Sequence, residues 1–156
     1  MARYFLESSA LVKRYKQEVG TDVVDRLFDF ENHELFYLSL AEIEVRKVFY
    51  RLWKHPHPGE AGTPISEEAF NALESRLAYE LSQMRRIGLT DPMIEKSVSI
   101  LDTVWLRSVF DLVQLAAYLM TKETTDDLIF VCADERSHLV SAARAFVDEE
   151  YLLVPK

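Results

Sequence analysis

The sequence predicts an α/β domain built around a central, mostly parallel sheet. Short apolar runs alternate along the chain with longer stretches in which apolar residues recur every three or four positions. This alternation is typical of parallel sheets, because helices make the connections between their strands. The clearest strand is "DLIFVCA", residues 127–133, a continuous apolar run of the kind found in sheets covered on both faces. The length of 156 residues suits a single domain, 1–156, in which helix outweighs strand.

The first third of the chain predicts two strands and three helices. The expected elements are a strand over residues 3–6, helices over 9–16 and 21–30, a second strand "ELFYLS" over 34–39, and a helix from there to residue 53. Ser39 and Glu42 have the spacing of a capping box, which opens the third of these helices. Ala41, Val45, Val48, Phe49 and Leu52 supply its apolar stripe.

The rest of the chain predicts a loop, four helices and three strands. Residues 54–66, "KHPHPGEAGTPIS", are rich in proline and glycine and form the loop. Ser66 then caps a long amphipathic helix that runs to about residue 87, and Ser108 opens one to about residue 120 that is apolar on nearly every side. Asp91 as cap and Pro92 as first helical residue open the helix between them, to about residue 105. The remaining expected elements are a short strand over 87–90, the strand over 127–133, a helix over 136–146 and a last strand over 151–155.

Composition restricts the classes of function. A net charge of −8 argues against a protein that holds nucleic acid through its overall field, since a polyanion needs local positive potential. The single cysteine, Cys132, lies in an apolar run and is expected to be a small buried residue without a disulfide. The sequence carries no leader pattern and no apolar run of the roughly 20 residues that a membrane span needs, so we expect a cytoplasmic protein.

Four carboxylates are expected at positions from which they could converge. Glu7 and Asp134 directly follow two predicted strands, and ligands bind beyond the carboxyl ends of the strands in open parallel sheets. Asp111 lies in the first turn of the apolar helix, where the helix dipole favours an ionised carboxylate, and Glu44 lies one turn into the helix that follows the second strand. Oxygen ligands without a cysteine or histidine cluster select Mg²⁺ or Mn²⁺. Such an ion would join an acidic pocket to a phosphodiester.

Each of these acids also has a purely structural interpretation. Asp111 stands three residues after Ser108 and can complete a capping arrangement, while Asp134 can cap the helix that follows it. Glu7 is less suited to that role, since glutamate is a poor N-cap. Glu42 is better explained as the capping partner of Ser39 than as a ligand, whereas Glu44 has no such local explanation.

Histidines and bases near the expected site have structural interpretations too. His55 and His57 have the spacing of a metal pair, but no third ligand is evident and prolines hold their loop extended. Basic residues on the two helices that border the site suit either phosphate contact or a solvated helix face. They are Lys13, Arg14, Lys16, Arg46, Lys47, Arg51 and Lys54.

Four blocks of the sequence, in order, resemble the PIN domain family in its VapC-like toxin branch. They are "YFLESSALVKRY", "LSLAEIEVRKVFYRL", "LRSVFDLVQLAAYL" and "FVCADERSHLVSAARAF", and they frame residues 3–147. The family's acids match Glu7, Glu44, Asp111 and Asp134, and Gln114 matches a family position that holds His or Gln. Residues 54–105 carry no family signature.

The resemblance implies a three-layer α/β/α nuclease fold, PIN-like and helix-rich. It further implies a Mg²⁺ or Mn²⁺ site made by the four acids, with Ser9 orienting Glu7. The implied activity is metal-dependent cleavage of RNA by the toxin of a toxin-antitoxin pair, and the implied partners are RNA, an antitoxin protein and a second copy in a homodimer. The family's first acid is nearly always Asp, so Glu7 departs from the pattern and moves the carboxylate outward by one methylene.

Two alternatives follow from that departure and from the acid pocket. The first is a PIN-like scaffold that has lost much of its catalysis through Glu7 but still binds RNA or a protein partner. The second is a small phosphatase-like or phosphoacceptor domain, although the paired acids and the late lysine that such domains use are not evident. Neither a glycine-rich phosphate loop nor a nucleophile elbow is present, which argues against nucleotide-binding Rossmann enzymes and serine hydrolases.

Overall fold

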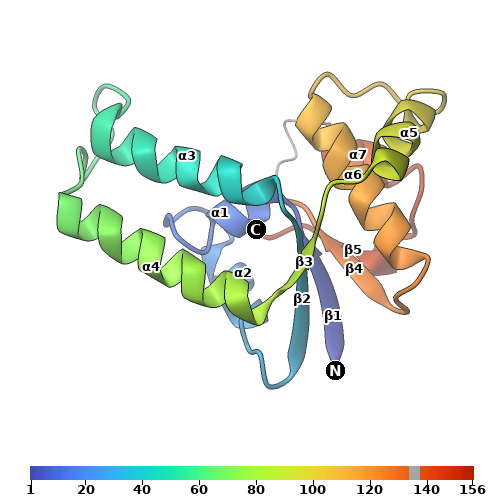
Figure 1. Ribbon diagram of the computed structural model, residues 1–156, viewed down its shortest axis with the longest axis horizontal. Helices are drawn as coiled ribbons and strands as arrows, with labels where there is room; N and C mark the ends of the chain where they lie inside the picture. The colour runs from blue at the N-terminus through green and yellow to red at the C-terminus, as the bar shows by residue number, and fades with distance from the viewer. Residues whose placement is uncertain (134–137) are drawn as a thin grey trace.

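The computed structural model describes residues 1–133 and 138–156, and in them shows an all-parallel sheet of five strands between two layers of helices (Figure 1). The strands are β1 (Ala2–Leu6), β2 (His33–Leu38), β3 (Arg85–Ile87), β4 (Leu128–Val131) and β5 (Leu152–Leu153). Their order across the sheet is β3-β2-β1-β4-β5, and every neighbouring pair is parallel. The expected three-layer α/β/α architecture is therefore confirmed.

The helices divide between the two faces of the sheet (Figure 1). One face carries α1 (Ser8–Val12), α2 (Thr21–Leu27), α3 (Ala41–Lys54) and α4 (Glu67–Gln83); the other carries α5 (Asp91–Ile100), α6 (Val109–Lys122) and α7 (Leu139–Ala143). A 3₁₀ turn, η2 (Glu149–Tyr151), leads into β5. Within the described residues, none of the helices has both the length and the apolar character needed to cross a bilayer.

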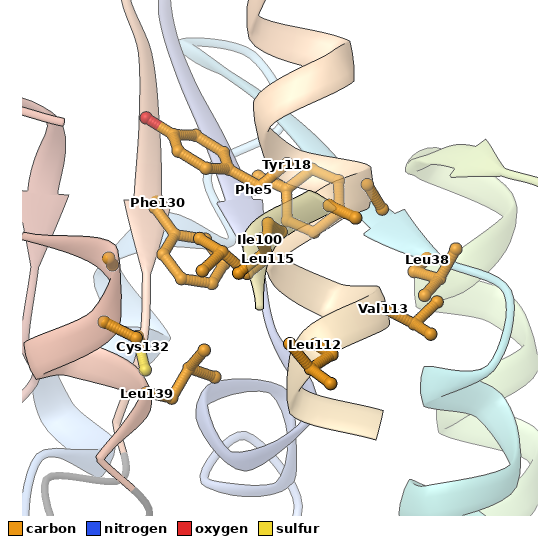
Figure 2. Packing of buried hydrophobic residues seen from close by; sticks show 14 of the residues in the cluster. Phe5, Leu38, Ile100, Leu112, Val113, Leu115, Tyr118, Phe130, Cys132 and Leu139 are labelled. Carbon is orange, nitrogen blue, oxygen red and sulfur yellow. The ribbon is translucent and has the colours of Figure 1, made fainter. Parts of the chain in front are cut away.

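Two apolar clusters hold the helices to the sheet, because alternate residues of each strand point to opposite faces. Phe5 packs in the α6 cluster together with Tyr118 and Phe130, whereas its neighbour Leu6 packs in the α1–α4 cluster. Figure 2 shows the first cluster, in which the Tyr118 ring stacks on Phe130 at 4.6 Å and meets Phe5 edge-on at 5.9 Å. The Tyr118 hydroxyl donates to the Leu128 carbonyl oxygen at 3.0 Å, so its burial leaves no donor unpaired.

Helices with strong caps and long apolar stripes form where the sequence predicts them. The Ser66 hydroxyl accepts from the Ala69 amide at 3.0 Å and begins α4. The Ser108 hydroxyl accepts from the Asp111 amide at 3.3 Å and begins α6, whose residues from Leu112 to Tyr118 are all buried. The free Cys132 is buried as expected.

The predicted capping box at the start of α3 is wrong. Leu40 is the N-cap and no side chain caps the helix, while the amide of Ser39 donates to the Ile87 carbonyl of the neighbouring strand. The Glu42 carboxylate instead accepts from the Tyr37 hydroxyl and pairs with two arginines, Arg46 and Arg86. A carboxylate with three partners, two of them from neighbouring strands, gains more than the single local bond that a capping box offers.

Several boundaries also differ from the predicted ones. The first helix ends at Val12, and the Thr21 hydroxyl donates to the Lys13 carbonyl where the chain turns toward the second helix, which ends at Leu27. β3 begins at Arg85, inside the range predicted as helix, because its backbone pairs with β2. Thr90 rather than Asp91 is the N-cap of α5, which ends at Ile100, and α7 is confined to Leu139–Ala143 in the described part.

Candidate functional site

The strand order places the carboxyl ends of β1 and β4 at the switch point of the sheet. From β1 the chain builds outward through β2 and β3 on one side, and β4 and β5 then fill the other side. The helices after the two central strands therefore diverge, which leaves a crevice where parallel sheets bind ligands. Glu7 directly follows β1, and its amide donates to the Val131 carbonyl at the end of β4 at 3.1 Å. Asp134, predicted at the same edge, lies outside the described residues.

Glu7 is a buried carboxylate, only 3% exposed. It is the N-cap of α1, contrary to the expectation that glutamate caps poorly: its Oε1 accepts from the Ala10 amide at 3.0 Å, and the Ser9 hydroxyl donates to the same oxygen. Burial raises the pKa of Glu7 to about 7, against the lowering effect of the Ser9 and Ala10 bonds, and the Asp111 carboxylate adds to the rise. Because these hydrogen bonds come from neutral donors, they do not offset the free-energy cost of burying the negative charge of Glu7.

Glu44 is half-buried and comes from α3, not from the α1 segment that carries Glu7. It projects from the first turn of α3, and burial raises its pKa, while a hydrogen bond from Ser8 and the charge of Lys47 act in the other direction. Ser8 in turn accepts from the Gln114 amide nitrogen at 2.5 Å. Because the amide nitrogen can only donate, the Ser8 hydroxyl is left to donate to Glu44. Ser8 and Gln114 are both buried, so this relay joins α6, α1 and α3 beneath the site.

Asp111 has two interpretations from the sequence, a helix-capping role and a place in the acid site, and the structure bears on each. Its backbone amide serves the cap at Ser108, so the local role is confirmed for the main chain. Its carboxylate lines the same cavity as Glu7 and is near enough to raise the pKa of that residue. Asn at this position would keep the capping bond and remove only the charge, which makes the two roles separable.

One cavity of about 580 Å³ brings these side chains together. It lies against α1, the first residues of α6 and the length of α3. Its lining consists of Glu7, Ser8, Ser9, Val12, Glu44, Lys47, Val48, Tyr50, Arg51, His55 and Asp111. Four of the five predicted site residues thus share a cavity, although they come from positions 7, 9, 44 and 111 of the chain.

The described acids have the chemistry of a site for a hard divalent cation but do not surround a single point. Glu7, Glu44 and Asp111 offer only carboxylate oxygens, which suit Mg²⁺ or Mn²⁺. The Asp111 carboxylate helps to raise the pKa of Glu7, and this repulsion between like charges is what a bound cation would offset. Among residues 1–133 and 138–156, however, no three carboxylate, histidine or thiol groups lie close enough together to hold one ion.

Most of the bases expected at the border of the site are neutralised by acids. Those that pair with carboxylates are Lys13, Arg14, Lys16, Arg46 and Arg51. Lys47 differs from them, since it is exposed, lines the cavity and has no ion-pair partner within the described ranges. His55 lines the far end of the same cavity.

Sequence reasoning missed the relay and the apolar wall of the cavity. Gln114 matched a family position, but the only physical signal for a role was a polar residue inside an otherwise apolar helix. Ser8 gave no such signal, because its partners come from segments distant in sequence. Val12, Val48 and Tyr50 follow the ordinary helical pattern of apolar residues, which does not reveal that they face a cavity.

Solved structures with the same fold exist at low sequence identity. The structure of VapBC2 from Rickettsia felis bound to a DNA fragment from their promoter matches 86% of this chain and 89% of its own, at 11% identity and a TM-score of 0.59. The structure of FitAcB from Neisseria gonorrhoeae matches 98% of this chain and 96% of its own, at 14% identity and a TM-score of 0.64. No protein-family model and no curated sequence matches the chain. The likeness shows a PIN-like α/β/α fold.

Proposed function

We propose that this protein is a metal-dependent endoribonuclease that hydrolyses RNA phosphodiesters, the toxin of a toxin-antitoxin pair acting in the cytoplasm. The observation that carries the proposal is the shared cavity at the switch point of the sheet. It gathers Glu7, Glu44 and Asp111 from three distant segments. Carboxylates that share a partly buried cavity repel one another, and a bound divalent cation would offset this repulsion. The PIN-like fold and the resemblance of the four sequence blocks support the same activity.

In the proposed mechanism, Glu7, Glu44, Asp111 and Asp134 would hold Mg²⁺ or Mn²⁺, and the three described carboxylates would draw closer together around the ion. When bound, the ion supplies Lewis-acid polarisation of the phosphodiester and lowers the pKa of water. The Ser9 hydroxyl fixes Oε1 of Glu7, and the bond from Ser8 keeps the Glu44 carboxylate oriented and favours its ionised form. Lys47 offers a positive charge to a phosphate on the open side of the cavity.

The test is Mn²⁺-dependent cleavage of labelled single-stranded RNA by the wild type and by Asp111→Asn and Asp134→Asn. We expect losses larger than the roughly 10- to 100-fold that follow from removing a group that only orients a ligand. Asp111→Asn keeps the backbone bond to Ser108, so its thermal unfolding should stay that of the wild type. Asp102→Asn is the matched control, since Asp102 is an exposed acid beyond α5. Unchanged cleavage by both site variants would reject the assignment.

One observation favours the second candidate, a PIN-like module that binds RNA or a protein but cuts poorly. With a pKa of about 7, Glu7 is only partly ionised near neutral pH, and a protonated carboxyl is a weak metal ligand. Glu7→Asp separates the two functions. If the wild type is inert and Glu7→Asp cleaves RNA with Mn²⁺, the binding module is correct; if the wild type cleaves and the variant gains nothing, the nuclease is correct.

We also propose a separate antitoxin protein and a homodimer as partners. Both structural neighbours are named as complexes, one of them bound to a fragment of promoter DNA. For the homodimer, α5 presents an exposed apolar stripe of Ile94, Val98 and Leu101, and Trp105 beyond it is 79% exposed. Contiguous exposed apolar surface of this kind marks interaction sites. Sedimentation of Val98→Glu beside the wild type tests the dimer, which the charge should dissociate.

A further inference from the structure

The cavity has a second wall, formed by α1 and α3, that the acid site does not use. Val12 on α1 and Val48 and Tyr50 on α3 make it, so the lining of the cavity is more apolar than polar overall. A pocket that only held a cation would have no need of this wall, because hard ions take oxygen ligands. An apolar wall beside a polar end is typical of pockets for organic ligands.

Tyr50 is an exposed aromatic ring whose position is fixed from behind. It is 48% exposed, yet it packs edge-on against Phe70 at 4.9 Å and lies 6.2 Å from Trp53. Phe70 and Trp53 stack on each other at 4.4 Å, so α4 and α3 together support the tyrosine. A ring held in this way gives contact area to a ligand at a small cost in side-chain entropy.

The polar groups and the apolar wall follow one another along α3. Glu44 and Lys47 are three residues apart, as are Lys47 and Tyr50, and this spacing puts each pair on adjacent turns of one face. The distance along the helix axis from Glu44 to Tyr50 is about 9 Å at 1.5 Å per residue. A phosphate near the acids and Lys47 would therefore direct the base attached to it toward the ring.

We propose that this wall is a nucleobase subsite, which takes one unpaired base of a single-stranded RNA against Val12, Val48 and Tyr50. The subsite rests on the proposed function, since it places the phosphate of the same nucleotide at the acid end of the cavity. Stacking on an aromatic face accepts any base, so the subsite selects unpaired strands rather than a sequence. A base inside a duplex cannot enter without being unpaired and unstacked.

Charge favours a nucleotide over an apolar protein segment as the occupant. Glu7 is buried and Glu44 half-buried in the lining of the cavity, and an apolar segment closing the cavity would remove more water from both carboxylates. A nucleotide arrives with its divalent cations, which oppose that effect. Its phosphate also offers a direct anionic contact to Lys47, an exposed base on the lining of the cavity whose charge already acts on Glu44.

The test measures binding by fluorescence anisotropy of a labelled ten-nucleotide oligouridine, with Ca²⁺ replacing Mn²⁺ so that bound RNA is not cut. We expect Tyr50→Leu to weaken binding about tenfold, which is the effect of losing one base–aromatic stack. Tyr50→Phe keeps the ring and should bind as the wild type does. Tyr79→Leu is the matched control, because Tyr79 is 67% exposed on α4 and does not line the cavity. A duplex competitor should not displace the probe.

Lys47→Gln provides a second variant that does not depend on packing, since Lys47 is exposed. It should weaken binding and reduce the dependence of the affinity on salt by about one phosphate contact. Equal affinity for Tyr50→Leu and wild type, or equal competition by duplex RNA, overturns the subsite. If the apolar dye ANS occupies the cavity in a Tyr50-dependent manner but oligouridine does not displace it, the proposal is also overturned, in favour of a protein segment. Tyr50-dependent binding without Mn²⁺-dependent cleavage keeps the subsite and rejects only the nuclease.

Discussion

Glu7 and Glu80 are two glutamates of nearly equal burial, 3% and 6% exposed, whose pKa values move in opposite directions. Burial raises the pKa of Glu7 to about 7, and its hydrogen bonds come from a hydroxyl and backbone amides. Burial is the largest single influence on Glu80 and acts to raise its pKa, but the hydrogen bond and charge of Arg14, 2.7 Å from Oε1, together with the charge of Arg76 and the other bonds to this carboxylate make the net shift downward. Arg76 contacts the same oxygen at 3.3 Å.

The two glutamates differ in the charged groups that surround each carboxylate. Around Glu80 the fold brings cations from two segments, and Asp25 shares Arg14, so the cluster is complete within the protein. At Glu7 the charge that contributes to the pKa shift is that of another carboxylate, Asp111, and it acts in the same direction as burial. A buried acid with its own arginine belongs to the architecture, whereas a buried acid beside another acid is the usual mark of a functional site.

The largest effect should come from breaking the complete cluster. Glu80→Gln leaves the part-buried Arg14 with only the more exposed Asp25 as carboxylate partner, and we expect it to lower the free energy of unfolding by about 3 kcal/mol at pH 7. Because the folded-state pKa of Glu80 is depressed, its contribution is present above the unfolded value of 4.5 and is lost as the pH falls below it. Urea unfolding at pH 7 and pH 3 measures this.

The control for that experiment is an exposed pair on the same face of the sheet. Arg26 and Asp22 lie 3.3 Å apart on α2 with most of both side chains in solvent. Asp22→Asn should change the free energy of unfolding by less than about 0.5 kcal/mol. A loss as large as that of Glu80→Gln would show that net charge, rather than burial, controls these effects.

At Glu7 we expect the stability to change with pH in the direction opposite to that at Glu80. The folded-state pKa of Glu7, about 7, lies above the unfolded value of 4.5, so the stability it contributes is fully present below pH 4.5 and is lost as the pH rises through 7. Without metal, Glu7→Gln should therefore be about 3 kcal/mol more stable relative to wild type at pH 8 than at pH 4.5. Glutamine keeps an oxygen to accept from Ala10.

Urea unfolding in EDTA across this pH range makes the measurement, and added Mn²⁺ provides the second arm. If Glu7 helps to bind the ion, Mn²⁺ should stabilise the wild type and leave Glu7→Gln nearly unaffected. A difference between variant and wild type that does not change with pH would mean that Glu7 has a cation partner, and the contrast with Glu80 would fail.

Whether a feature can be predicted from the sequence depends on whether the interactions that form it are local or join residues distant in the chain. Strands with continuous apolar runs and helices with strong caps at Ser66 and Ser108 are local features, and they form where predicted. That Glu7, Glu44 and Asp111 line one cavity was also predictable, because the topology of a parallel sheet brings strand ends and helix starts to one edge.

What the sequence did not reveal are choices among distant partners. The capping box at Glu42 failed because Tyr37 and Arg86 compete for the same carboxylate from two strands. The neutralisation of Arg14 by Glu80 joins residues 66 positions apart, so no local spacing indicates it. Acids and bases that looked alike in the sequence therefore separate into paired and unpaired groups only when the fold is known.

The smallest effect should come from the relay of hydrogen bonds from Gln114 through Ser8 to Glu44. This relay supports the Glu44 carboxylate with hydrogen bonds, whereas Glu80 is supported by arginine charges. Ser8→Ala removes the donor to Glu44 and the acceptor for Gln114, whose Oε1 already has no partner in the described part of the structure. We expect a loss of about 1 kcal/mol in the free energy of unfolding and a further rise in the pKa of Glu44. Gln114→Met should cost a similar amount.

The double variant distinguishes a relay from two unrelated bonds. If Gln114 acts only through Ser8, Ser8→Ala combined with Gln114→Met should cost less than the sum of the two single changes, by several tenths of a kcal/mol or more. Ser97→Ala is the matched control: Ser97 is a buried serine whose hydroxyl donates to the Met93 carbonyl within its own helix, so it should be additive with Gln114→Met. Additivity of Ser8 and Gln114 as well would mean that the hydroxyl orients Glu44 without the amide, and that α6 contributes only Asp111 to the site.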